Sequence, residues 1–307
     1  MEHVYDMIVI GGGPGGYTAA LYATRAGLDT VVLEKISAGG QMTQTTQIDN
    51  YPGFHQGVDG FDLGERMQQG AERFGAQTVL AEVQAVELTG EIKKIETSEG
   101  TFLGRTVVIA TGAEHRHLGV EQEDQLVGKG VAYCAACDGM FYKGKTVAVI
   151  GGGNSAVADA LILSRICEKV ILVHRRDTLR ATKVYHDQLN KTPNIEFRWN
   201  SAVHGLVAED RLTAIQLENV QTGEVSQLPV DGVFVSVGRA PVTELFQGQV
   251  ELDQGGYIVA DESTRTNLPG VFAVGDVRTK ALRQIITAAS DGAVAAHYAE
   301  AYLAESR

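Results

Sequence analysis

The chain contains one pattern twice, a short apolar strand followed at once by a glycine-rich turn and a helix, and this repeat restricts the fold more than any other feature of the sequence. The first turn is residues 11–16, GGGPGG, and the second is residues 151–156, GGGNSA. Each helix leads into a second strand, which ends at Glu34 in the first copy and at His174 in the second. The first glycine of the turn precedes this residue by 23 positions in both copies. The sequence therefore predicts two copies of one βαβ unit.

The glycines of the first turn meet the requirements of a dinucleotide-binding unit. Gly11 allows the tight turn, Gly13 lets the backbone approach a pyrophosphate, and Gly16 lets helix and strand pack closely. The helix N-terminus supplies amide donors for the phosphates. Pro14 belongs to the same turn, and the corresponding candidates in the second turn are Gly151, Gly153, Asn154 and Ser155. We expect an α/β fold with two Rossmann-like dinucleotide-binding domains, each a parallel sheet with a smaller antiparallel β layer and flanking helices.

The residues that end the two second strands distinguish the two ligands. Glu34 can accept hydrogen bonds from a free adenosine ribose, as in FAD or NAD, but it repels a 2′-phosphate. The second copy instead offers His174, Arg175 and Arg176, with Arg180 four residues further on. Guanidinium groups bind phosphate well, so the second site is predicted to prefer NADPH. The alternative is that these arginines form a solvated charged face.

A pair of cysteines lies between the two copies. Cys134 and Cys137 form a CxxC motif, which can close a small disulfide ring that exchanges readily with other disulfides. Asp138 follows directly and is a candidate proton shuttle. The alternatives for a single CxxC are half of a zinc site or a structural pair. The chain has three cysteines, too few for a four-cysteine zinc site, and Cys167 in its apolar surroundings is expected to be a core residue.

The pairing of a nucleotide with a disulfide suggests a second cofactor. NADPH delivers a hydride, whereas a disulfide accepts electrons through nucleophilic sulfur chemistry, and a flavin can do both. The first unit, with its acid for a free ribose, is therefore predicted to bind FAD. A third stretch supports this assignment, because Asp276 follows Gly275 at the end of an apolar strand, where a carboxylate could bind a ribityl chain.

The charge of the chain restricts its partners and its location. The net charge of −12 and the pI of about 5.1 argue against nucleic acid or an anionic membrane as the main partner. Apolar runs end after about five residues, far short of the ~20 that span a bilayer. No cationic leader precedes an apolar segment at the N-terminus, so we expect a cytoplasmic protein. In that reducing compartment a CxxC is expected to be catalytic rather than structural.

The order of the motifs predicts a discontinuous first domain. If Asp276 and the last helix complete the FAD unit, that unit is built from both ends of the chain. We expect an FAD-binding domain at residues 1–115 and 244–307, and an NADPH-binding domain at residues 116–243 that carries the cysteines.

Together these motifs, over essentially the whole chain, resemble the bacterial-type, low-molecular-weight NADPH-dependent thioredoxin reductases. The resemblance implies that Cys137 faces the flavin, that Cys134 attacks the disulfide of thioredoxin or a similar dithiol protein, and that Asp138 moves the proton. It also implies a homodimer. The further residues that it places on FAD are Gly40, Gln41, Asn50, Thr111, Gly112, Asp276, Arg283 and Gln284.

The sequence departs from the family pattern beside the cysteines. The family often has Thr at the position of Ala136 and aromatic residues at the positions of Met140 and Phe141. These changes affect the docking surface for a particular thioredoxin. Three other functions are alternatives: a relative that takes electrons from ferredoxin or another donor, a flavoprotein that reduces peroxiredoxin, and a flavin-containing redox sensor without fast turnover. Arg175, Arg176 and Arg180 argue against ferredoxin as the electron donor.

Overall fold

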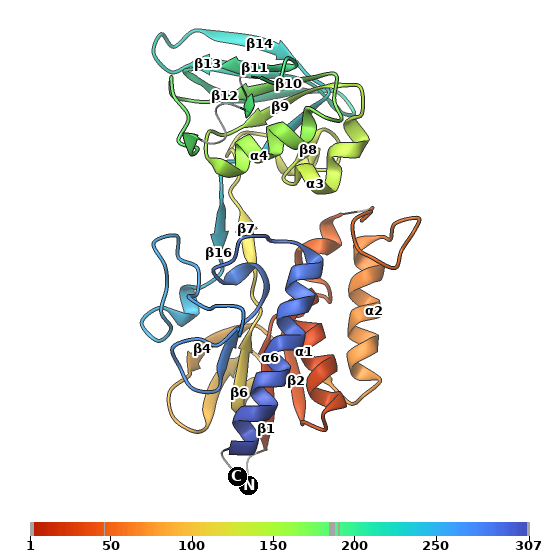
Figure 1. The fold of residues 1–307 in the computed structure, drawn as a ribbon, viewed down its shortest axis with the longest axis vertical. Helices are drawn as coiled ribbons and strands as arrows, with labels where there is room; N and C mark the ends of the chain where they lie inside the picture. The colour runs from red at the N-terminus through yellow and green to blue at the C-terminus, as the bar shows by residue number, and fades with distance from the viewer. Residues whose placement is uncertain (1–2, 46, 184–187, 190, 306–307) are drawn as a thin grey trace. The chain divides into compact units, whose positions relative to one another are not determined.

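The computed structural model describes residues 3–45, 47–183, 188–189 and 191–305 (Figure 1). The chain folds into two compact units, which we call unit 1 (residues 1–114 and 240–307) and unit 2 (residues 115–239). It passes from one unit to the other twice. The two connecting segments, β7 (Ala113–His115) and β16 (Arg239–Pro241), pair in a two-stranded sheet.

Unit 1 is built on a seven-stranded sheet with a parallel and an antiparallel part. The parallel strands, in spatial order, are β3 (Gln77–Leu80), β2 (Thr30–Glu34), β1 (Val4–Ile10), β6 (Gly100–Ile109) and β17 (Val271–Ala273). The long strand β6 serves both parts. Its residues 107–109 pair with β17, whereas its residues 100–104 pair in the antiparallel direction with β5 (Lys93–Thr97), which pairs with β4 (Val83–Glu87).

Both faces of the parallel sheet in unit 1 are buried, which explains why its strands are continuous apolar runs. The helices α1 (Pro14–Arg25) and α6 (Ile285–Glu305) lie side by side on one face, and α2 (Gly60–Glu72) follows α1 in the same layer (Figure 1). A Cβ at Gly292 would lie 2.2 Å from the Gly15 carbonyl oxygen, so the glycine lets α6 approach α1 closely. The antiparallel strands and residues 246–277 cover the other face.

Unit 2 has a five-stranded sheet that is parallel throughout. In spatial order its strands are β11 (Ile195–Arg198), β10 (Lys169–Val173), β9 (Thr146–Ile150), β15 (Gly232–Val235) and β8 (Val131–Ala132). The helix α4 (Asn154–Leu163) and the short helix α3 (Ala135–Asp138) pack on one face. The antiparallel sheet of β12 (Ser201–Ala208), β13 (Leu212–Asn219) and β14 (Val225–Pro229) covers the other face.

The strand order reverses at the same place in both units. In unit 1 the chain continues from β1 to β2 on one side and later returns with β6 on the other side of β1. In unit 2 the strands β10 and β15 flank β9 in the same way. Ligands of open α/β sheets bind at such a reversal, beyond the carboxyl ends of the strands. The predicted fold class is confirmed. Within the described part of the chain, no helix has the length and apolar character needed to cross a bilayer.

Candidate active site

The first glycine turn lies at the strand reversal of unit 1 and leaves its backbone open. Gly11 has φ +104°, and a Cβ there would lie 2.6 Å from the Ala110 carbonyl oxygen at the end of the neighbouring strand. A Cβ at Gly16 would lie 2.0 Å from the Gly11 carbonyl oxygen, so this glycine is required for packing. At Gly13, by contrast, an added Cβ would meet no atom within 4 Å. The open space at Gly13 leaves room for a ligand to approach the turn.

The second turn repeats this geometry in unit 2. Gly151 has φ +151°, and a Cβ there would lie 2.4 Å from the carbonyl oxygen of Ser236, which follows β15. Gly153 again faces open space. The Asn154 side chain accepts a hydrogen bond from the Thr182 N–H at 2.9 Å, and it thereby holds the following loop against the turn. Two turns of different sequence therefore present the same open backbone.

Glu34 lies beside the first turn at the end of β2. Its Oε2 atom accepts the Gly12 N–H at 2.6 Å, and its Oε1 atom accepts the N–H groups of Lys35 and Ile36. These three amides fix the carboxylate at the carboxyl edge of the sheet. Ile36 (76% exposed) follows the end of β2, and Leu80 (61% exposed) is the last residue of β3 at the same edge. Two exposed apolar side chains beside this carboxylate could contact a flat heterocycle such as adenine.

His174 takes the equivalent position in unit 2 but is buried (4% exposed). Its ring lies against Gly152, where an added Cβ would be 2.3 Å from the ring. Burial and then the positive charge of Arg180 lower the pKa of His174 below its usual value, so the ring is neutral at pH 7. Its Nε2 atom has no hydrogen-bond partner among the described residues.

The three predicted arginines are exposed beyond the carboxyl end of β10. The N–H groups of Arg180 (2.7 Å) and Ala181 (3.1 Å) both donate to the Gly152 carbonyl oxygen. The loop that carries Arg175 and Arg176 is thereby held next to the glycine turn. The structure therefore brings three exposed positive charges to the turn, where a phosphate group could bind between them.

The remaining candidates of unit 1 come together from distant parts of the chain. Asn50 Nδ2 donates to Gln284 Oε1 at 3.0 Å, across 234 positions of sequence. The Arg283 guanidinium donates to the Asp276 carbonyl oxygen at 3.3 Å and lies 4.0 Å from the centre of the Tyr257 ring. Two candidates in loops of the same unit donate to backbone carbonyl oxygens, Gln41 to Ala113 and Thr111 to Val242. The candidates Gly40 and Gly112 both have positive φ.

The cysteine pair forms a disulfide at the start of α3 in unit 2. Cys134 and Cys137 are bonded, and the Cys137 N–H donates to Cys134 Sγ at 3.2 Å. Burial raises the pKa of Asp138 to about 6, so this carboxyl group can give and take a proton near neutral pH. Cys167 is 6% exposed, and burial raises the pKa of its thiol to about 11, as expected of an inert core residue.

Two structural features near the candidate residues were not predicted from the sequence. Asp291, 5% exposed on α6, forms ion pairs with the buried side chains of Arg278 and Lys280 beside the turn that carries Asp276. A signal existed, because Asp291 lies on the buried alanine stripe of its helix. The other feature is the segment 236–238, which follows β15 as residues 110–112 follow β6. Each segment ends in a glycine with positive φ, at the point where the chain leaves its unit.

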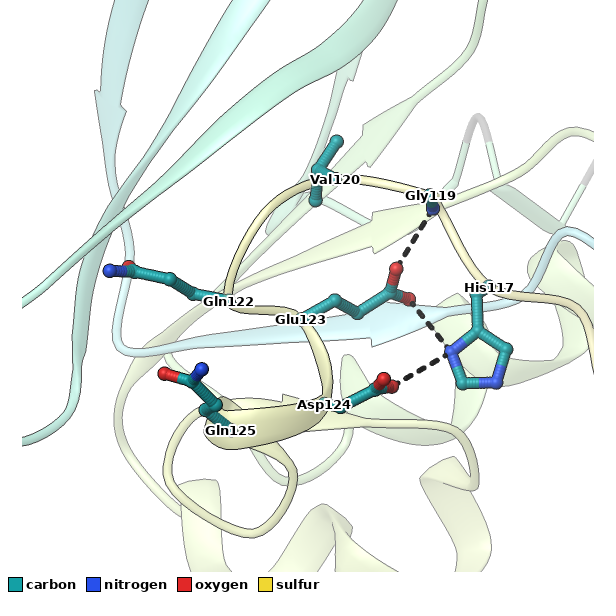
Figure 2. Close-up of a pocket in the computed structure, with 7 residues that line it drawn as sticks. All are labelled: His117, Gly119, Val120, Gln122, Glu123, Asp124 and Gln125. Carbon is teal, nitrogen blue, oxygen red and sulfur yellow. Dashed lines mark hydrogen bonds and ion pairs between the residues drawn. The ribbon is translucent and has the colours of Figure 1, made fainter.

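A separate polar pocket lies in unit 2 and is lined by His117, Gly119, Val120 and residues 122–125 (Figure 2). The buried carboxylate of Glu123 accepts the N–H groups of Leu118 and Gly119, and Tyr133 donates to it at 2.7 Å. The pocket contains no residue of the glycine turns or the CxxC motif. Glu123 holds this loop through these bonds, and we do not include the pocket in the candidate site. Among the described residues, no cluster of His, Cys, Asp and Glu is arranged to hold a metal ion.

Comparison with known proteins agrees with this geometry. The family model described as pyridine nucleotide-disulphide oxidoreductase matches residues 5–292. The thioredoxin reductase of Streptomyces clavuligerus is 48% identical over 307 residues, which cover 99% of this chain and 95% of that protein. The crystal structure of thioredoxin reductase from Streptococcus pyogenes has a TM-score of 0.91 at 41% identity and covers 98% of this chain and 99% of that one.

One similar structure has another electron donor in its name and matches over nearly the whole of both chains. The ferredoxin-flavin thioredoxin reductase from Clostridium acetobutylicum is 29% identical with a TM-score of 0.53, and 98% of each chain is covered. The resemblance of the sequence to thioredoxin reductases is confirmed by the identities and by the match in structure. The chain therefore belongs to the thioredoxin reductases of the pyridine nucleotide-disulphide oxidoreductase family.

Proposed function

We propose that the protein is a flavoprotein disulfide reductase that carries electrons from NADPH through FAD and the Cys134–Cys137 disulfide to oxidised thioredoxin. One observation carries the proposal most directly. A CxxC disulfide is followed by a carboxyl group whose pKa of about 6 suits proton transfer, and both belong to the unit whose nucleotide turn is flanked by arginines. The names of the relatives supply the substrate, since several are thioredoxin reductases.

FAD is assigned to unit 1, which then corresponds to the FAD-binding domain expected at residues 1–115 and 244–307. When bound, a flavin accepts a hydride from a nicotinamide and passes electrons to a disulfide. The open backbone at Gly13 receives the pyrophosphate, and Glu34 accepts hydrogen bonds from the adenosine ribose. The other residues assigned to FAD are Gly11, Pro14, Gly16, Gly40, Gln41, Asn50, Thr111, Gly112, Asp276, Arg283 and Gln284.

NADPH is assigned to unit 2, at the turn that contains Gly151, Gly153, Asn154 and Ser155. Arg175, Arg176 and Arg180 bind the 2′-phosphate, because exposed guanidinium groups at this edge pair with phosphate oxygens. The neutral His174 ring packs against Gly152 of this turn, and its Nε2 atom, which has no partner among the described residues, can accept a hydrogen bond from a ribose hydroxyl. The fold alone does not select the donor, since a relative named for ferredoxin shares it, so the assignment of NADPH depends on the arginines.

The cysteines exchange with the substrate in two steps that balance electrons and protons. The reduced Cys134 thiolate attacks one sulfur of the oxidised partner, which breaks the partner disulfide and forms a mixed disulfide. The departing partner thiolate takes a proton from Asp138. Cys137 then attacks Cys134 and gives its thiol proton to the Asp138 carboxylate. This step restores the internal disulfide and releases the second partner sulfur as a thiolate, which takes a proton from water. The hydrogen bond from the Cys137 N–H to Cys134 Sγ favours the thiolate at Cys134.

The distribution of charge suits a protein partner at unit 2. Unit 1 carries 24 Asp and Glu against 12 Lys and Arg, whereas unit 2 carries 14 of each. The net charge of −12 therefore lies entirely in unit 1, and the unit that bears the cysteines has no net charge with which to repel an acidic partner. Met140 (58% exposed) and Phe141 (49% exposed), just after Asp138, provide an apolar contact surface there. We also propose that the protein is a cytoplasmic homodimer and that it binds no nucleic acid.

The test measures the visible flavin absorption of the FAD-loaded protein under anaerobic conditions. We expect NADPH to bleach the visible flavin absorption, oxidised thioredoxin to restore it, and reduced ferredoxin to be a poor replacement for NADPH. Continuous NADPH oxidation should require thioredoxin. A protein that fails to bind FAD, or that oxidises NADPH at the same rate without any disulfide substrate, would contradict the proposal.

A further inference from the structure

We infer that Asp291 is a positioning residue for FAD, because it fixes the turn that carries Asp276 and Arg283. The inference rests on the proposed assignment of FAD to unit 1. Asp291 is 5% exposed and lies on the buried side of α6, so its side chain is not available to contact a ligand directly. It acts through other groups, and each link of that arrangement is a direct contact.

The Asp291 carboxylate accepts four hydrogen bonds. Its Oδ2 atom accepts the Gly275 N–H at 2.8 Å, Arg278 Nε at 2.9 Å and Lys280 Nζ at 2.7 Å. Its Oδ1 atom accepts Arg278 Nη2 at 2.8 Å. Burial opposes ionisation, but the hydrogen bonds from Arg278 and Lys280 outweigh it and hold the pKa of Asp291 below its usual value. Asp291 is therefore a charged acceptor throughout the neutral pH range.

Arg278 extends this arrangement to two further segments. It is 1% exposed, and its Nη1 atom donates to the carbonyl oxygens of Ala260 (3.2 Å) and Thr279 (2.9 Å). Every nitrogen of the guanidinium group thus has an acceptor. Because a guanidinium fork is planar and rigid, these bonds leave Arg278 one orientation. The backbone of Arg278 is fixed with it.

The candidate FAD residues are attached to this fixed backbone. Gly275, whose N–H is bonded to Asp291, directly precedes Asp276 in the chain. Arg283 donates to the carbonyl oxygens of Asp276 (3.3 Å) and Arg278 (3.1 Å). Hydrogen bonds and the peptide chain therefore link Asp291 to the backbone of Asp276 and to the Arg283 side chain. If Asp291 loses its charge, the Gly275 turn and the Arg283 guanidinium lose their common anchor.

Stability alone does not require this ion cluster. A buried ion pair can often be replaced by apolar residues of similar volume without loss of stability. Removal of one partner, by contrast, leaves the other charge buried and unpaired, which destabilises the protein. An apolar replacement of the whole cluster is therefore expected to preserve the fold and to weaken FAD binding, so an experiment can separate the two effects.

The experiment compares FAD binding and fold stability in the full-length apoprotein. We expect Asp291→Asn to raise the dissociation constant for FAD at least tenfold in fluorescence titrations, while 2′,5′-ADP binding by unit 2 is unchanged. Glu123→Gln is the matched control, because Glu123 is a buried carboxylate (3% exposed) that accepts backbone N–H groups in unit 2. It should lower thermal stability and leave FAD affinity at the wild-type value.

A second variant covers the case in which Asp291→Asn does not fold. The triple variant Asp291→Leu, Arg278→Met, Lys280→Met removes all three charges together. We expect it to melt near the wild-type temperature as apoprotein and still bind FAD at least tenfold more weakly. Wild-type FAD affinity in either folded variant would overturn the inference. Failure of the unmutated protein to bind FAD would instead refute the assignment of FAD to unit 1.

Discussion

Glu34 and His174 lie at equivalent positions against the middle glycine of their turns, but only Glu34 bonds to that glycine. The Gly12 N–H donates to Glu34 Oε2 at 2.6 Å, whereas the neutral His174 ring packs flat against Gly152. In the proposed function the Glu34 carboxylate would accept hydrogen bonds from ribose hydroxyls and repel a 2′-phosphate. The neutral His174 ring adds no negative charge beside Arg175 and Arg176. This difference is the basis on which the proposal assigns FAD to one unit and NADPH to the other.

The first prediction concerns the choice between NADPH and NADH. Replacement of Arg175 and Arg176 by Ala should raise the KM for NADPH about 10- to 100-fold, since a hydrogen bond to a charged group contributes about 1.5–3 kcal/mol. The KM for NADH should change little, because NADH lacks the 2′-phosphate. Steady-state kinetics with both nucleotides measure this. Arg165→Ala, an exposed arginine just after the opposite end of α4, is the control and should leave both values unchanged. An unchanged KM for NADPH in the double variant would refute the phosphate site.

The second prediction separates packing from cofactor approach in the first turn. Gly16→Ala should destabilise the apoprotein by about 3 kcal/mol, because its Cβ would lie 2.0 Å from the Gly11 carbonyl oxygen. Gly13→Ala should leave apoprotein stability nearly unchanged, since its Cβ meets no atom within 4 Å, yet it should weaken FAD binding. Denaturant melts and FAD titrations measure the two effects. Equal FAD affinity in Gly13→Ala and the wild type would show that no ligand approaches the turn at that point.

The third prediction concerns the redox disulfide. Cys134→Ser should reduce thioredoxin turnover by about 10³-fold or more, because the attacking sulfur is lost. Bleaching of the flavin absorption by NADPH should continue at the wild-type rate. Cys167→Ala is the control, since that thiol is buried and its pKa is raised to about 11. Stopped-flow absorbance and a coupled thioredoxin assay measure the two half-reactions. Loss of thioredoxin turnover in the Cys167 variant would contradict the assignment of the redox pair.

The fourth prediction concerns proton transfer by Asp138. Asp138→Asn should slow thioredoxin reduction about 10²-fold near neutral pH, because the amide cannot donate the proton. The wild-type rate of the exchange step should fall as the pH rises through about 6, where the carboxyl group ionises. The Asn variant should lose this dependence. A pH profile of the reoxidation half-reaction measures it, and an identical profile in the variant would exclude Asp138 as the proton donor.

A linked prediction on stability follows from the same raised pKa. Because the folded protein binds the Asp138 proton more tightly than the unfolded chain does, folding stability is lost as the pH rises from about 4 to about 6. Burial raises the pKa from 3.8 to about 6, which corresponds to about 2 kcal/mol after allowance for partial exposure. Asp138→Asn should therefore be more stable than the wild type at pH 8 and nearly equal at pH 4, as urea melts at the two pH values would show.

Local sequence patterns were sufficient to predict the two nucleotide units. The strands β1 and β9 are buried on both faces, so their apolar runs are continuous. Each of these two strands is followed by a glycine that the backbone itself requires, with φ +104° at Gly11 and φ +151° at Gly151. These requirements involve neighbours within a few residues of each other or one adjacent strand. The CxxC pair is likewise local, because four residues are enough to close its ring.

The sequence by itself thus determined the fold class, the two turns and the redox motif, whereas only the tertiary structure decided which side chains share an environment. His174 and Arg175 are adjacent in sequence, yet one is buried and neutral and the other is exposed. Asn50 meets Gln284 across 234 positions. The Asp291 cluster was not predicted at all. Burial and hydrogen-bond partners depend on contacts between distant segments, and no spacing along the chain records those contacts.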